Sequence, residues 1–264
     1  MLVVPSFCAS IARCGSQGPG SMSDLRIRRR LSDEDVIPTW ARSHVMLLAS
    51  FDPREQRPRR LKMRICTTCN SKLGQIFERR SSELMKPMLH GATVILDRKD
   101  QTHISCWIIK TSLLVTVMGL KQEDPDRALA LAMIRRLMAE RLPPVQTLIR
   151  IFTRDIEDEK LAVGPAEQAQ VQAPPTAFFS ITSIGFLGWE MAIGPNWPIL
   201  AYQSETSGYP GFLQIWPPRE PEVRWPPSTV VNTQKIDILR AAYLASSKPG
   251  TSEPIIRRWG GPED

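Results

Sequence analysis

Two cysteines with two residues between them are the sharpest chemical signal in this chain of 264 residues. Cys66 and Cys69 stand in the run CTTCN. Two thiolates at this spacing on a turn can hold one side of a tetrahedral zinc ion, which then needs two further ligands. Cys8 and Cys14 are the candidates for these, although their spacing is looser than that of an ordinary zinc knuckle. The pattern favours a structural zinc ion, and it is also compatible with a redox dithiol or with unrelated thiols.

The histidines do not complete a familiar catalytic pattern. The chain has three of them, His44, His90 and His103. None belongs to a Ser-His-Asp order or to an HExxH helix, and the chain has no glycine-rich phosphate loop. His90 precedes a glycine at the predicted end of a helix, where a cation is favourable. These observations exclude the common sequence patterns of serine hydrolases, zinc proteases and nucleotide-binding enzymes.

Positive charge is concentrated before the cysteine pair. The net charge is +7, and residues 24–64 alone carry eleven Arg or Lys against six Asp or Glu, which leaves 11 − 6 = +5. A local basic field attracts polyphosphates, so this charge favours contact with nucleic acid. A solvated surface with no ligand is the alternative interpretation. The candidate nucleic-acid contacts are Arg26, Arg28, Arg29, Arg30 and Lys72.

The overall composition is that of an ordinary globular protein, with 42% apolar and 23% charged residues. No run of 18 apolar residues occurs, so we predict no membrane span and no membrane partner. The first residues lack a basic segment before their short apolar run, which argues against a secretory signal. Five cysteines are too few, and odd in number, for a secreted disulfide framework. We therefore expect a cytoplasmic protein.

The elements that must position these residues are both helical and extended. Apolar residues alternate in some stretches and recur at helical spacing in others, which predicts an α+β protein. The run 66–70 is predicted to be a tight loop. We predict strands at residues 25–30, 61–65, 145–153, 178–190 and 212–216, and helices at residues 71–90, 104–118, 124–142 and 229–245.

The same signals divide the chain into five parts. The first holds the cysteine pair and its associated helices, and the third is rich in Ala, Gln and Pro, which is typical of a flexible linker. The parts are a cysteine-containing module at 1–120, a helix–strand connection at 121–156, a linker or insertion at 157–177, a mixed α/β C-terminal region at 178–247 and a mobile tail at 248–264.

Several short segments of the chain form a recognisable series. They are LSDEDVIPTW at 31–40, ICTTCN at 65–70, an apolar stretch ending in Phe-Glu at 73–78, WIIKT at 107–111, LPP at 142–144, QIWPP at 214–218 and WPP at 225–227. Together they resemble the bacterial HNH-endonuclease-like proteins of the His-Me finger, zinc-knuckle class. Each segment is short, but their order extends the resemblance over most of the chain. The resemblance implies an HNH-like ββα zinc-knuckle module followed by helices, with metal-dependent phosphodiester hydrolysis as the ancestral activity.

The chain departs from this family at the position that matters most for catalysis. Asp35 stands where the family carries the histidine that serves as general base. An aspartate is a much weaker base than histidine at neutral pH, so we expect hydrolysis to be weakened or lost unless His44 is recruited. The resemblance still implies a catalytic site made of Glu34, Asp35 and Asn70, whose oxygens would hold Mg²⁺ or Mn²⁺.

Two hypotheses from different functional classes follow. The first is an HNH-endonuclease-like protein that binds nucleic acid, with DNA favoured, and that hydrolyses it only if a base remains. The second is a non-enzymatic, zinc-stabilised adaptor that binds a protein partner through its C-terminal region, which the linker and the Trp-Pro segments suggest. Those tryptophans have an alternative role as core aromatics at strand ends, where proline stops further pairing.

Overall fold

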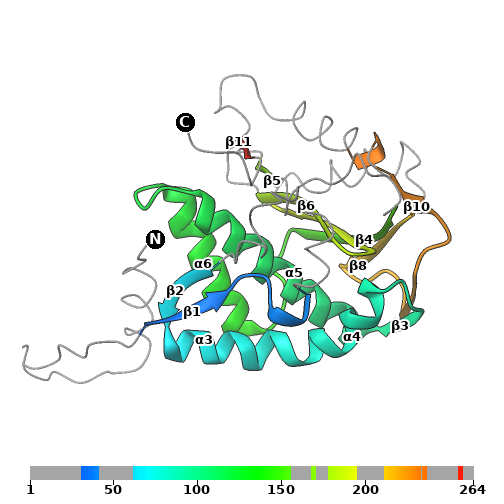
Figure 1. Cartoon of the computed structure of the whole chain (residues 1–264), viewed down its shortest axis with the longest axis horizontal. Helices are drawn as coiled ribbons and strands as arrows, with labels where there is room; N and C mark the ends of the chain where they lie inside the picture. The colour runs from blue at the N-terminus through cyan, green and yellow to red at the C-terminus, as the bar shows by residue number, and fades with distance from the viewer. Residues whose placement is uncertain are drawn as a thin grey trace, which may run out of the picture.

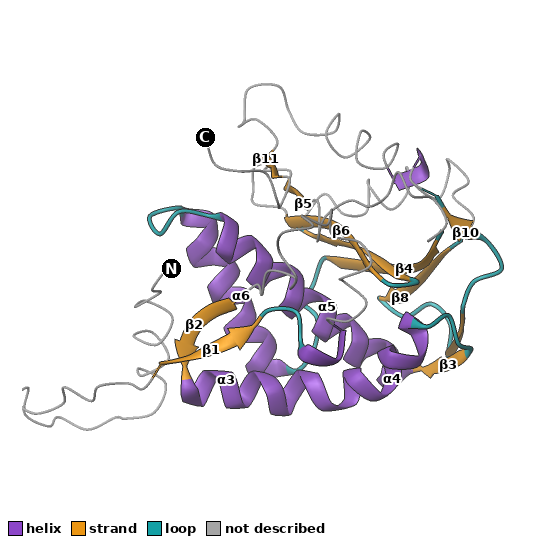
Figure 2. Ribbon diagram, in the orientation of Figure 1, coloured by secondary structure: helices purple, strands orange, loops and turns teal. Residues whose placement is uncertain are grey.

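The computed structural model describes residues 31–41, 62–155, 178–194, 211–232 and 234–236, and the backbone of two short paired strands, β5 (Gln168–Gln170) and β11 (Ile255–Arg257). The helices form one layer and the larger sheet another, while short paired strands lie beside the helices (Figure 1, Figure 2). The helices of residues 67–140 lie together, and a sheet formed by strands within residues 147–231 lies on one side of the longest helix, at residues 98–119. The predicted α+β class is confirmed.

A two-stranded hairpin leads directly into the first helix. β1 (Leu31–Asp35) pairs antiparallel with β2 (Lys62–Cys66), and α3 (Thr67–Leu73) starts at the next residue. Met63 and Ile65 lie on the buried face of β2, as the alternation in the sequence predicts. The sequence does not predict β1, because acidic residues are poor strand formers. Contacts with other elements, described below, override that preference.

The helix after the hairpin begins earlier and is less regular than predicted. The sulfur of Cys66 accepts a hydrogen bond from the N–H of Cys69 at 3.3 Å, so the prediction of a tight loop was wrong and this run is the capped first turn of α3. A π-helical segment, η2 (Gly74–Glu78), connects α3 to α4 (Arg79–Leu89). The helix stops before Gly91, whose φ of 75° favours glycine.

The longest helix lies in the core. α5 (Arg98–Gly119) is buried along most of its length, and the Asp97 side chain caps its start. Among the described residues it is the one helix long and apolar enough to cross a bilayer, but most of it is enclosed by the protein, as in the core helix of a globular protein. α6 (Pro125–Glu140) packs against α5, and Arg127 of α6 donates hydrogen bonds to carbonyl oxygens at the end of α5. Both helices were predicted.

A five-stranded sheet packs on α5. Its order is β10-β4-β7-β6, with β8 also paired to β4. The single strand predicted at residues 178–190 is two strands, because Gly185, with a φ of 55°, allows a tight turn between them. The strands are β4 (Thr147–Arg154), β6 (Phe178–Ile184), β7 (Leu187–Ile193), β8 (Phe212–Trp216) and β10 (Val230–Val231).

A smaller sheet was not predicted. β3 (Val94–Asp97) and β9 (Glu222–Trp225) pair antiparallel beside the helical layer. β10 occupies the start of the helix predicted at residues 229–245, so the prediction was wrong there, whereas residues 234–236 are helical as predicted. Most of that segment lies outside the described residues, as do the strand predicted at 25–30 and most of the linker predicted at 157–177.

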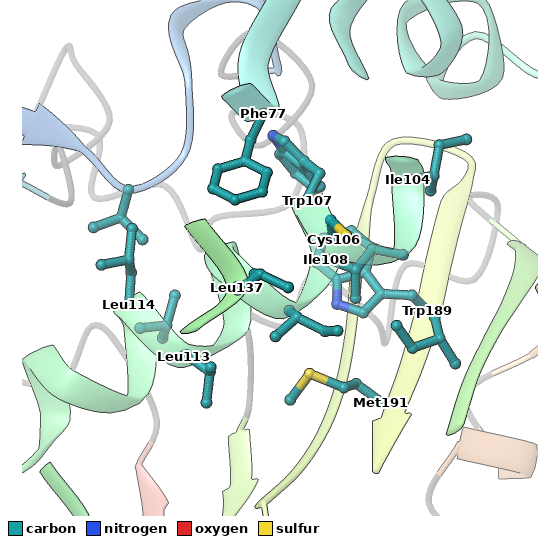
Figure 3. Packing of buried hydrophobic residues seen from close by; sticks show 14 of the residues in the cluster. Phe77, Ile104, Cys106, Trp107, Ile108, Leu113, Leu114, Leu137, Trp189 and Met191 are labelled. Carbon is teal, nitrogen blue, oxygen red and sulfur yellow. The ribbon is translucent and has the colours of Figure 1, made fainter. Parts of the chain in front are cut away.

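One hydrophobic core joins the helical layer and the sheet. Trp107 of α5 lies at its centre, with its ring 5.6 Å from that of Trp40 and 5.8 Å from that of Trp189 on β7. Figure 3 shows Phe77, Trp107 and Trp189 meeting in this core. The buried cluster therefore runs continuously from the hairpin to the sheet, across the boundary predicted near residue 120.

Candidate functional site

The cysteine pair sits where the hairpin turns into the helix. Cys66 ends β2 and Cys69 lies in the first turn of α3, with their sulfurs 2.8 Å apart. Both side chains are largely buried. Two converging sulfurs fit half of a thiolate zinc site. The other two candidate ligands, Cys8 and Cys14, lie outside the described residues, and the described part of the chain holds no group of three or more His, Cys, Asp or Glu suited to a metal.

Asn70 ties the helix back to the hairpin. Its side-chain Nδ2 donates to the Ser32 hydroxyl at 2.9 Å and to the backbone carbonyl of Asp33 at 3.1 Å, both on β1. The amide nitrogen is therefore committed to structure, and the amide oxygen is the end that is suited to bind a cation. Together β1, β2 and α3, which we call the hairpin–helix unit, form a ββα arrangement fixed by Asn70.

The carboxylates of Glu34 and Asp35, which are neighbours on β1, point in different directions. Successive side chains of a strand face opposite sides, so Glu34 and Asp35 lie on different faces of the hairpin. Glu34 is buried, and its Oε1 lies 3.7 Å from the Nζ of Lys110 on α5. The metal set of Glu34, Asp35 and Asn70 that the resemblance implies does not fit this geometry. Asp35 and Asn70 remain as candidate oxygen donors, but Asn70 binds the Ser32 hydroxyl on the Glu34 face of β1, so the alternation directs Asp35 to the other face.

Glu34 belongs instead to a buried charge cluster. Lys110 is completely buried and pairs with Oε1 of Glu78, the last residue of η2. The other carboxylate oxygen of Glu78 accepts hydrogen bonds from the indole N–H groups of Trp40, at 3.2 Å, and Trp107, at 3.4 Å. Burial raises the pKa of Glu34, and the nearby Glu78 carboxylate raises it further, while Lys110 opposes both effects. We call these five residues the Lys110 cluster.

The Lys110 cluster unites three segments of the family resemblance. Glu34 and Trp40 come from the first, Glu78 from the Phe-Glu stretch, and Trp107 and Lys110 from the WIIKT segment. Sequence reasoning assigned a functional role to one of these residues alone, and that role was metal binding. The missed signal was a lysine in the middle of an apolar helix, since a buried ammonium requires a carboxylate partner.

Exposed cations lie on the outer side of the first helices. Lys72 on α3 and Lys86 on α4 are exposed, and the Arg79 side chain is 90% exposed. Arg80 is committed to Asp100, at 2.7 Å. The candidate contacts Arg26, Arg28, Arg29 and Arg30 lie outside the described residues, so Lys72 is the candidate whose placement is known.

The histidines have structural surroundings where they are described. His90 caps the end of α4, as predicted. A ring N–H of His103 on α5 binds the backbone carbonyl of Phe77, and burial together with nearby Arg80 lowers the pKa of His103. The candidate replacement base His44 lies outside the described residues.

No protein-family model, curated protein or solved structure matches this chain. Its function is therefore inferred from the hairpin–helix unit, the Lys110 cluster and the exposed cations. Of these, the hairpin–helix unit carries the most chemical information, because it brings two thiols, an amide and a carboxylate-bearing strand into one small region.

Proposed function

We propose that the chain is an HNH-endonuclease-like protein that binds nucleic acid, preferably DNA, and whose phosphodiester hydrolysis is weakened or lost. The observation that carries this proposal is the hairpin–helix unit. A hairpin runs without a loop into a helix that opens with the cysteine pair, and Asn70 on that helix binds back to the first strand. This is the ββα order that the family resemblance implies, assembled from the same segments.

Charge supports nucleic acid as the partner. Lys72, Arg79 and Lys86 extend into solvent along the outer side of α3 and α4. Arg79 approaches Glu83 at 3.9 Å, which at such exposure contributes little. Cations held on a rigid helix attract phosphates without a prior ordering cost, and they add to the basic segment that precedes the hairpin.

The carboxylates support weak or absent catalysis. Asp35 takes the place of the family's imidazole, and Glu34 is engaged by Lys110 inside the protein. Asp35 and Asn70, which the alternation of β1 directs to different faces, offer Mg²⁺ or Mn²⁺ one carboxylate and one amide oxygen that are not brought together, without a base matched to neutral pH. Such a site can bind substrate while activating water poorly.

A nicking assay tests the catalytic part of the proposal. Supercoiled plasmid is incubated with Mg²⁺ or Mn²⁺ and either the natural protein or Asp35→His. Restoring the imidazole is expected to raise the nicking rate about 10²- to 10⁴-fold, which is the range for a positioned general base. Asp35→His combined with Asn70→Ala is the matched control and is expected to lose the gain. Fast cutting by the natural protein would instead make it an active enzyme, and no cutting by any variant would count against the family assignment.

A binding titration tests the nucleic-acid part separately. We expect a fluorescent DNA duplex to bind with an affinity that falls steeply with salt, and Lys72→Gln with Lys86→Gln to reduce the slope of log K against log salt by about 0.9 for each phosphate contact removed. Arg136→Gln, which removes an exposed cation on α6, is the matched control. Equal binding by both variants, or no binding by the natural chain, would contradict the proposal.

Zinc content tests the structural metal. Purified protein is expected to carry about one zinc ion per chain, and Cys69→Ser is expected to lose it. The buried thiol of Cys106 on α5, whose pKa is raised by burial to about 12, provides the control, since Cys106→Ser should keep the metal. Retention of zinc by Cys69→Ser would exclude the cysteine pair as its ligand.

The described residues give less support to the adaptor alternative. Trp225 ends β9 and is completely buried, and Trp216 ends β8 and packs against the core. Their positions favour the role of core aromatics at strand ends over that of exposed docking residues. The third such residue, Trp197, lies outside the described residues.

A further inference from the structure

Lys110 touches two carboxylates that come from different elements. Glu78 belongs to the π-helical segment η2, and Glu34 belongs to β1, more than seventy positions before Lys110. The Lys110 side chain has no exposed surface. A buried ammonium is retained only when its partners are in place, because an unpaired buried charge is strongly unfavourable. Its position therefore depends on β1 and η2 together, and theirs depend on it.

α5 presents an ordered row of anchors to η2. His103, Trp107 and Lys110 are spaced four and three residues apart, which places them on one face of the helix. A ring N–H of His103 binds the Phe77 carbonyl, and Trp107 and Lys110 both bind Glu78. Two of these residues, His103 and Trp107, bind η2. Lys110 alone among the three also reaches the hairpin, through Glu34.

Two polar contacts tie the hairpin to two different helices. A two-stranded hairpin is marginally stable by itself, so its placement is set by what it packs against. Asn70 of α3 binds β1, and Lys110 of α5 pairs with Glu34 of β1. The buried Met63 and Ile65 of β2 add apolar contacts with the core. Contacts with two helices define an orientation, whereas one permits rotation about the contact.

We propose that Lys110 is a positioning residue that, by pairing with Glu34 and Glu78 at once, sets where β1 lies on the helical layer and hence where Asp35 is directed. The consequence for nucleic acid rests on the proposed function, but the placement of the hairpin does not. The Lys110 side chain is too deeply buried to touch a ligand, so it acts through β1.

Hydrogen exchange resolved by peptide tests this inference. In Lys110→Met, the amides of β1 and β2 are expected to exchange at least about tenfold faster, while those of β4 and β7 change by less than about twofold. Lys110→Arg keeps the positive charge and is expected to restore most of the protection. An unchanged hairpin, or an equal increase in the hairpin and the sheet, would overturn the proposal, because the second result describes a general loss of stability.

Thiol labelling supplies an internal control in the same molecules. With a zinc chelator present, a maleimide is expected to label Cys66 and Cys69 faster in Lys110→Met than in the natural protein, with no change at Cys106, which is buried on α5 itself. Faster labelling of Cys106 would mean that α5 has loosened, and the proposal would fail. If Lys110→Met does not fold, Glu78→Gln, which weakens the same contacts, is expected to give the same contrast between cysteines.

Nucleic-acid binding is measured separately on the natural protein. Failure of that binding would remove the proposed function and leave the exchange contrast standing. Loss of the contrast would remove Lys110 as a positioning residue whatever the chain binds. The two results are therefore distinguishable.

Discussion

Two buried charge groups in the described part of the molecule differ in what they join. In the sheet, Arg150 of β4 lies directly opposite Glu190 of β7, with Nε and Oε2 2.6 Å apart, so one cation meets one anion on neighbouring strands. In the Lys110 cluster, one cation meets two carboxylates on elements that the chain brings together from far apart. The first group is electrically balanced and local, and the second is unbalanced and long-range.

Two charge groups that are equally buried can therefore have different roles in the fold. β4 and β7 are already held by a ladder of seven paired residues, so their ion pair adds to a connection that exists without it. Among the described strands the hairpin has no third partner, so we expect its charge contact to contribute more to where it lies. Loss of the sheet pair is expected to lower the free energy of unfolding. Loss of the hairpin contact is expected to change where the hairpin lies on the helices.

The largest loss of stability is expected from removing one member of the Arg150–Glu190 pair in the sheet. Arg150→Met leaves Glu190 buried without its partner, and removal of one member of a buried pair destabilises by about 3–5 kcal/mol. The free energy of unfolding from urea denaturation measures this loss. Hydrogen exchange should show it as faster opening of the whole structure, in contrast to the hairpin-specific change expected for Lys110→Met.

A double variant sharpens the comparison. Arg150→Met with Glu190→Leu removes both charges and is expected to recover most of the loss, since a buried pair can be replaced by apolar side chains. Lys110→Met with Glu78→Leu should not recover, because Glu34 stays buried without its cation. Recovery in both double variants, or in neither, would show that the two groups are energetically alike.

A smaller effect is expected from adding one methyl group to each region. A Cβ at Gly188 on β7 would lie 2.1 Å from a ring carbon of Phe152 on β4, so Gly188→Ala should cost about 1–3 kcal/mol through strain. A Cβ at Gly74, at the start of η2, would meet nothing within 4 Å. Gly74→Ala is therefore expected to be neutral or to stabilise by up to about 1 kcal/mol. A stabilising Gly188→Ala in thermal denaturation would contradict the tight packing of β4 against β7.

The sequence predicts those parts of the fold whose signals are local. The capped start of α6 and the buried pattern of α5 are visible as Asp-Pro and as an apolar stretch, and both helices are confirmed. β1 was missed because three of its five residues are acidic, and their strand conformation depends on partners elsewhere. The turn at Gly185 was missed because continuous burial on both sides hides a break in a strand.

The candidate site was predictable in its residues and not in their directions. The proximity of Cys66, Cys69 and Asn70 follows from the chain itself, and the structure keeps them together at the start of α3. Glu34 and Asp35 are neighbours in sequence, but the alternation of a strand separates them. Had β1 been recognised as a strand, one buried and one exposed carboxylate would have been the natural prediction. A lysine within the apolar helix was the signal that a carboxylate lies buried beside it.

The smallest expected effect is a pH dependence of stability that arises from Glu34 in the Lys110 cluster. The pKa of Glu34 is raised above its ordinary value of 4.5, chiefly by burial, so the folded protein holds this proton more tightly than the unfolded chain does. Stability must then fall as pH rises from about 4.5 through the raised value, and stay lowered above it. Glu34→Gln imitates the protonated form and keeps an oxygen that can accept from Lys110. It is expected to match the natural protein near pH 4 and to be modestly more stable at pH 7.5.

Urea denaturation at the two pH values measures this difference, with Glu83→Gln as the matched control because that carboxylate is exposed on α4. The control should show no comparable gain at pH 7.5. A Glu34→Gln variant that is less stable at pH 7.5 would mean that attraction to Lys110 outweighs burial. The Lys110 cluster would then resemble the balanced pair of the sheet, and the contrast between the two regions would reduce to their positions in the fold.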